Sequence, residues 1–126
     1  MALIYYTQNN NGIGERLQKA INAAVPEELT EVYGSLESLS QRLCQLTYKL
    51  KIAVLLAANR EELLGILSVR DLFRDIRIIL ILPDQEKETV SDGLRLYPRF
   101  FTYVDSNFKD VTAVLEKMMK HMNINK

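Results

Sequence analysis

The sequence predicts an α/β fold of three layers, a doubly wound arrangement in which helices cover both faces of a five-stranded parallel sheet. Three observations lead to this prediction. Five apolar runs alternate with five longer segments of helical periodicity, as in strand–helix–strand units. Three of the runs are apolar almost throughout, whereas two carry polar residues. The 126 residues are 48% hydrophobic and 25% charged, which fits one globular domain over residues 1–126.

The first part of the chain supplies two strand–helix pairs. The apolar run Ala2–Thr7 precedes a helical segment, Gly12–Val25, and Pro26 marks the loop after it. The run Glu28–Gly34 alternates apolar and polar residues, as an exposed edge strand does. The next segment, Ser35–Leu50, has leucines spaced by three and four residues on one helical face, and its first serine can cap it.

The middle of the chain places a helix between two continuously apolar strands, Lys51–Ala58 and Ile76–Pro83. Both faces of such strands must be covered. The helical segment is Asn59–Asp75, in which Asn59 is a cap residue followed closely by two glutamates that complement the helix dipole. The third strand therefore runs directly into a helix start.

The last part of the chain supplies the fourth helix and the final strand–helix pair. The helical pattern of Asp84–Tyr97 is the weakest, because Gly93 interrupts a short polar segment. The run Arg99–Val104 carries polar residues and suits an edge, and Ser106–Met122 has a clear amphipathic stripe. Polar second and fifth strands at the edges predict the order 2-1-3-4-5, which is flavodoxin-like. Right-handed crossovers then place the first and fifth helices on one face and the other three on the opposite face.

Composition narrows the class of protein. Sixteen basic residues balance sixteen acidic ones, so the chain lacks the overall excess of positive charge that is typical of proteins that bind nucleic acid directly. Cys44 is the only cysteine, which excludes an internal disulfide, and we expect it to be a small buried residue. No apolar run is long enough for a membrane span, and the N-terminus lacks the features of a signal peptide. We therefore expect a soluble cytoplasmic protein without a membrane partner.

The chain resembles the receiver domain of two-component response regulators over nearly its whole length. The stretch “KIAVLLA” resembles the receiver strand that ends in the phosphoacceptor aspartate, and “RIILILP” resembles the strand that ends in Ser or Thr. The stretch “RFFTYVDSNFKDVTAVL” resembles the aromatic-bearing fifth strand and the helix after it. The resemblance implies a signalling domain with an acidic pair for Mg²⁺ after the first strand and a lysine after the fifth.

The residues that carry receiver chemistry are absent from the matching positions. Aspartyl phosphorylation needs a carboxylate, a divalent cation and a neutralising charge, and alanine supplies neither nucleophile nor ligand. We therefore expect a degenerate receiver that is no enzyme and has no catalytic residue, metal or cofactor. The matching positions are Thr7, Gln8 and Asn9 for the acidic pair, Ala57 or Ala58 for the phosphoacceptor, Pro83 for the Ser/Thr, and Val104 or Asp105 for the lysine.

Aromatic residues gather around the fifth strand, and the resemblance gives them a role. Receivers use the face formed by the fourth helix, fifth strand and fifth helix for dimerisation and docking. We expect Tyr97, Phe101 and Tyr103 to contribute to such an interface, with another signalling protein or a second copy of the chain as partner. Packing beneath the last helix is the alternative for these side chains.

A different hypothesis is a flavodoxin-like domain that binds a nucleotide or another phosphate ligand. In “TQNNNGIGERL”, after the first strand, the backbone amides of Asn10, Asn11 and Gly12 can bind a phosphate at a helix start. The stretch is neither a Walker loop nor a dinucleotide loop, because it lacks their lysine and third glycine. A polar loop with a helix cap is the simpler interpretation.

Two aspartates leave a metal-dependent function open. Asp84 and Asp105 follow strands that are neighbours in the predicted order, so they can share a cation, although helix capping explains each of them more simply. An enzyme on this scaffold would also need a Ser/His/Asp, Cys/His or metal-ligand set at the strand ends, and the sequence shows none.

Overall fold

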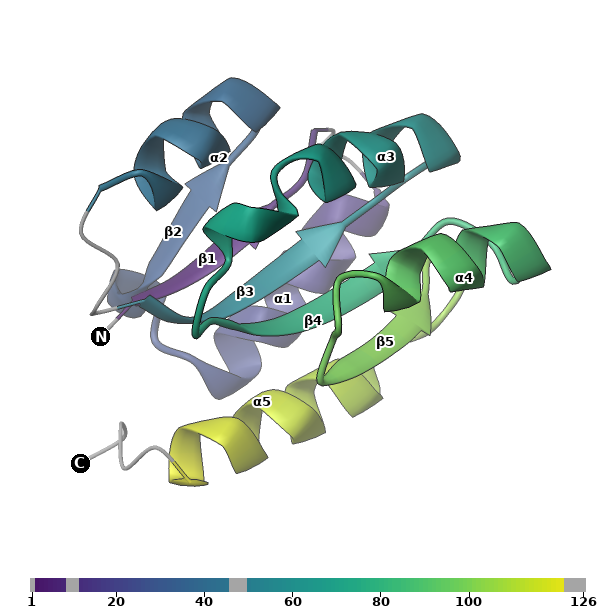
Figure 1. The fold of residues 1–126 in the computed structure, drawn as a ribbon. Helices are drawn as coiled ribbons and strands as arrows, with labels where there is room; N and C mark the ends of the chain where they lie inside the picture. Colours follow the sequence, from purple (N-terminus) through teal and green to yellow (C-terminus); the bar gives the residue numbers. More distant parts are fainter. Residues whose placement is uncertain (1, 9–11, 46–49, 122–126) are drawn as a thin grey trace.

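The structure, a computed structural model, describes residues 2–8, 12–45 and 50–121 (Figure 1). The strands are β1 (Ala2–Tyr6), β2 (Thr30–Tyr33), β3 (Leu50–Leu56), β4 (Arg77–Leu82) and β5 (Phe100–Tyr103). The helices are α1 (Ile13–Ala24), α2 (Leu36–Leu43), α3 (Arg60–Ser68), α4 (Lys87–Leu94) and α5 (Lys109–His121). All strand pairs are parallel and the order is β2-β1-β3-β4-β5, which confirms the predicted fold class and strand order.

The sheet separates two apolar layers. Helices α1 and α5 cover one face, and α2, α3 and α4 cover the other, as the crossover rule predicts (Figure 1). Successive residues of a strand point to opposite layers: Leu3 and Tyr5 lie in the layer with α1 and α5, and Ile4 and Tyr6 in the layer with α2 and α3. Both faces of β1, β3 and β4 are therefore buried, which explains their continuously apolar sequences.

The helices on the second face are shorter than their sequence patterns predict. Helix α2 ends at Leu43, α3 gives way to a separate 3₁₀ turn at Arg70–Leu72, and α4 begins only at Lys87. Cys44 consequently follows α2 and is exposed, so the expectation that it is buried is wrong. No helix in the described part of the chain is long and apolar enough to cross a membrane.

Two helices on this face begin at the cap residues that the sequence predicts. The Ser35 hydroxyl accepts a hydrogen bond from the Ser38 amide at 3.1 Å, and Asn59 Oδ1 accepts one from the Glu62 amide at 2.9 Å. Each cap satisfies a backbone N–H group that has no partner inside its helix. The second of these caps fixes the direction in which the chain leaves β3.

Glycine 93 brings α4 close to the sheet, and replacing it should be costly. In Gly93→Ala the added Cβ would lie 2.8 Å from Leu82 Cδ2 and 3.2 Å from Leu80 Cδ2, both on buried strand residues. We expect a loss of about 1–2 kcal/mol in unfolding free energy, measured by urea denaturation, despite the better helix propensity of alanine.

A matched change in α3 provides the control. In Gly65→Ala the nearest atom to the new Cβ is Leu36 Cδ2 at 3.5 Å, an ordinary contact. We expect this variant to be more stable by about 0.5–1 kcal/mol, because alanine favours a helix interior. If both substitutions stabilised the protein equally, the close approach of α4 would be refuted.

Candidate functional site at the carboxyl ends of the strands

The carboxyl ends of the strands meet at one edge of the sheet, where ligands of doubly wound folds bind. Three of the strands are followed by one more residue whose backbone amide is hydrogen-bonded to the neighbouring strand. The amides of Thr7, Ala57 and Val104 donate to the carbonyl oxygens of Tyr33, Ile81 and Leu82 at 3.2, 3.0 and 3.0 Å. The structure thus brings these three positions, which the sequence analysis singled out, to the same edge.

The edge is closed at its centre. Ala57 has no exposed surface and its methyl group belongs to the apolar layer beneath α3, and Thr7 is only 2% exposed. Pro83 and Val104 are half-buried, whereas Ala58, the next residue after Ala57, is exposed. The two alternative positions for a phosphoacceptor therefore differ sharply: one lies in the core and the other at the surface.

Tyr6 brings a polar group to this edge that the sequence analysis missed. Gln8 Nε2 donates a hydrogen bond to the Tyr6 hydroxyl at 2.8 Å. Burial raises the pKa of the Tyr6 phenol, the bond from Gln8 opposes this shift, and the negative charge of Glu62 adds to it. Alternation along β1 already places Tyr6 toward α3, but nothing in the sequence pairs it with Gln8.

The Glu62 carboxylate, close after Ala57 in the chain, has a capping role. Its Oε1 accepts a hydrogen bond from the Ala58 amide at 3.1 Å, and its Oε2 accepts one from Asn59 Nδ2 at 3.3 Å. With the bond from its own amide to Asn59 Oδ1, residues 58–62 form a reciprocal cap related to a capping box. Both oxygens of this carboxylate thus serve the start of α3.

An arginine from α1 holds the connection after β5. Arg16 Nη1 donates to the Ser106 carbonyl and Nη2 to the Val104 carbonyl, each at 3.2 Å. The same guanidinium lies over the Phe108 ring, 5.1 Å from its centroid. A cation therefore does reach the β5–α5 connection, but it comes from 88 to 90 residues away, and the sequence analysis missed it.

The two aspartates that follow β4 and β5 have different surroundings. Asp84 Oδ1 accepts a hydrogen bond from the Glu86 amide at 3.0 Å, which forms a turn before α4, and Asp105 is exposed. Across residues 2–8, 12–45 and 50–121, no group of three or more His, Cys, Asp or Glu side chains is placed to hold a metal ion. The turn formed by Asp84 favours the structural interpretation of this residue over the shared cation.

The proposed phosphate loop falls largely outside the described residues. Asn9, Asn10 and Asn11 all lie there, so the ligand loop and the third position of the missing acidic pair stay predictions. Gly12 is exposed and has a positive φ of 41°, a conformation that glycine adopts readily.

The three aromatic residues predicted to form an interface occupy two different places. Phe101 and Tyr103 project from β5 toward the layer of α2 to α4, where their half-buried rings meet edge to face with centroids 6.2 Å apart. Tyr97 lies in the loop before β5 and is 88% exposed. The structure therefore does not bring Tyr97 into one aromatic cluster with the other two.

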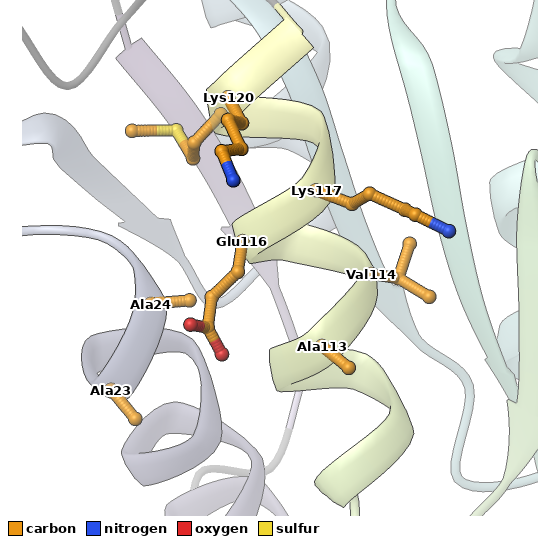
Figure 2. Close-up of a pocket in the computed structure, with 8 residues that line it drawn as sticks. Ala23, Ala24, Ala113, Val114, Glu116, Lys117 and Lys120 are labelled. Carbon is orange, nitrogen blue, oxygen red and sulfur yellow. The ribbon is translucent and has the colours of Figure 1, made fainter.

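A groove of about 610 Å³ lies between α1 and α5, away from the strand ends considered above. Figure 2 shows Glu116 pointing toward α1 and Lys117 pointing away from it. The wall on the α1 side consists of Ala23 and Ala24, whereas α5 contributes longer side chains, among them Glu116, Met119 and Lys120. Because these residues lie at the carboxyl-terminal ends of both helices, the groove is at the opposite end of the fold from Ala57.

Comparisons with known proteins identify the fold. No family model matches the chain, and no curated protein matches its sequence. Among solved structures, a protein described as pilus assembly-related from Burkholderia pseudomallei has 15% identity and a TM-score of 0.68, covering 93% of this chain and 87% of that one. A response regulator from Thermotoga maritima has 10% identity and a TM-score of 0.62, with coverage of 95% and 98%.

A third similar structure is the signal receiver domain of the response regulator NarL from Mycobacterium tuberculosis. It has 15% identity and a TM-score of 0.57, covering 94% of this chain and 95% of that one. Identities this low show a shared fold and leave the activity to be argued from the residues themselves. The chain thus has the receiver fold, as its sequence pattern suggests.

Proposed function

We propose that this chain is a non-catalytic signalling module that is not phosphorylated on aspartate and acts through contacts with other proteins. The observation that carries the proposal is the environment of Ala57. This residue follows directly after the central strand β3, where the receiver resemblance places the phosphoacceptor, and its side chain is fully buried in the apolar layer. A methyl group in that position offers no nucleophile and no metal ligand.

The neighbouring positions support the same proposal. Thr7 is buried and Pro83 carries no hydroxyl. The guanidinium of Arg16, which brings a positive charge to the β5–α5 connection, is already bound to two backbone carbonyls. Phosphoryl transfer depends on positioned charges around the transferred group. At the carboxyl ends of the strands, the polar groups described above instead form helix caps and hydrogen bonds to the backbone, which are structural roles.

The proposed contact face is the one formed by α4, β5 and α5, with another signalling protein or a second copy of the chain as partner. Leu94 at the end of α4 is 49% exposed, and Phe101 and Tyr103 on β5 are only half-buried. Aromatic and large aliphatic side chains at a surface are typical of protein interfaces. Arg60 links the adjoining α3 to α4 through ion pairs with Glu88 and Asp92 at 2.7 and 3.1 Å.

Incubation with acetyl phosphate and Mg²⁺ tests the absence of aspartyl phosphorylation. Because Ala57 and Ala58 have no carboxylate, we expect the intact mass of the protein to stay unchanged under conditions that label a receiver with an intact aspartate. Such a receiver, treated in parallel, is the control. A mass increase of one phosphoryl group that is removed by mild base would contradict the proposal.

A further inference from the structure

Arginines concentrate in the two connections that lead into β4 and β5. Of the eight arginines in the chain, five lie in residues 70–77 and 95–99, and neither segment contains a lysine. Only two acidic residues, Asp71 and Asp75, share these segments with them. A chain with no net charge thus carries a local positive surface at the amino-terminal ends of these strands. The arginines are Arg70, Arg74, Arg77, Arg95 and Arg99.

A hollow of about 280 Å³ opens within this arginine surface. It is large enough for one apolar or aromatic side chain, and its lining is divided between charged and apolar groups. Buried side chains of Phe73, Ile78 and Leu96 line it together with Arg70, Arg74 and Tyr97.

Tyr97 has an unusual conformation beside this hollow. Its side chain is 88% exposed, and its φ of 51° lies in the left-handed region that a bulky residue adopts only at a cost of about 1–2 kcal/mol. Its amide donates to the Leu94 carbonyl at 3.0 Å at the end of α4, a place where glycine is usual. The exposed ring gives the fold little burial, so a binding role explains it better.

Two of the surrounding arginines are available to a ligand. Arg95 makes a long ion pair of 3.7 Å with Asp92, and Arg70 Nη1 donates to the Leu67 carbonyl at 3.4 Å. Within the described residues, Arg74 and Arg99 form no ion pair, and both are exposed. Guanidinium groups bind carboxylates through paired, planar hydrogen bonds.

We propose that this hollow binds an acidic segment of a partner protein, with one apolar side chain held beside Tyr97 and carboxylates paired with Arg74 and Arg99. Arg and Tyr are enriched where binding energy concentrates in protein interfaces. The apolar part of the lining suits an apolar side chain of a peptide better than a phosphate backbone, which has no such group to place there. The surface lies apart from Ala57 and is additional to the α4–β5–α5 face.

Selection from a random peptide library against the immobilised full chain tests this binding without assuming a partner. We expect enrichment of peptides that combine several Asp or Glu residues with one aromatic or aliphatic residue. In fluorescence polarisation, the best selected peptide should bind the double variant Arg74→Glu/Arg99→Glu at least tenfold more weakly, and binding should weaken with added salt. Tyr97→Gly should bind severalfold more weakly although its backbone is relieved of strain.

Matched variants separate specific binding from general charge effects. Lys117→Glu/Lys120→Glu makes the same charge change on α5 and should bind like the wild type. Arg74→Gln/Arg99→Gln should bind weakly too, which keeps the test valid if charge reversal unfolds the protein, as a thermal melt would show. The proposal would be overturned if acidic peptides were not enriched, if they bound both arginine variants normally, or if a single-stranded oligonucleotide competed with them for the surface.

Discussion

The substitution Ala57→Asp, which supplies the carboxylate of a receiver, should lower the unfolding free energy by about 3–5 kcal/mol at neutral pH and restore no phosphorylation. Ala57 has no exposed surface, and its methyl group lies among apolar side chains. An aspartate there would be ionised without a partner or would have to take up a proton. Urea denaturation of the variant and the wild type at pH 7 measures the difference.

The pH dependence identifies charge burial as the cause of this loss. Burial raises the pKa of the introduced carboxyl above its unfolded value of about 4. Below that value both states are protonated and the loss is smallest. As the pH rises toward the folded-state pKa, only the unfolded state releases its proton, so the variant loses stability until both states are ionised. Ala57→Asn should instead show a loss that is independent of pH.

Ala58→Asp provides the positional control. Because Ala58 is exposed, a carboxylate there stays hydrated, and we expect a change within about 0.5 kcal/mol of the wild type. If Ala57→Asp were as stable as Ala58→Asp at pH 7, the end of β3 would be open to water, and the proposed loss of the site would rest on the missing residue types alone.

The strand order could be predicted because burial on two faces leaves a clear signature. Central strands β1, β3 and β4 are apolar at almost every position, with Lys51 and Arg77 near their amino-terminal ends, whereas the edge strand β2 contains Glu31 and exposes Val32. The expected loss of receiver chemistry rests only on which residue types follow the strands, and it stays a prediction. The ends of the helices are predicted less accurately than the strand order, because caps and 3₁₀ turns depend on local packing.

The geometry of the candidate site could not be predicted to the same degree. Which of Ala57 and Ala58 is buried depends on the register of the strand. A shift of one residue moves every side chain of a strand to the opposite face of the sheet. The contacts of Arg16 join residues far apart in sequence, so no local sequence pattern predicts them. Tyr97 was grouped with the aromatics of β5 because it is close in sequence, but its left-handed backbone places it in a loop outside the alternation of the strand.

A second large effect is expected at Phe108, which anchors the start of α5. Its ring is fully buried against the layer of α1 and α5, and truncation to alanine should cost about 3–5 kcal/mol of unfolding free energy. Its φ of 62° is unfavourable for any residue with a Cβ, so Phe108→Ala keeps the backbone strain while it loses the packing. Urea denaturation monitored by circular dichroism measures this loss.

Two further variants separate the contributions at this residue. Phe108→Gly removes the same ring and also the Cβ, so it should be no less stable than Phe108→Ala despite its smaller side chain. A double-mutant cycle with Arg16→Ala isolates the stacking of the guanidinium on the ring, for which we expect a coupling of about 0.5–1 kcal/mol. A loss below about 1 kcal/mol in Phe108→Ala would show that the ring does not anchor α5. Strictly additive effects would leave the two hydrogen bonds to the β5–α5 connection as the whole role of Arg16.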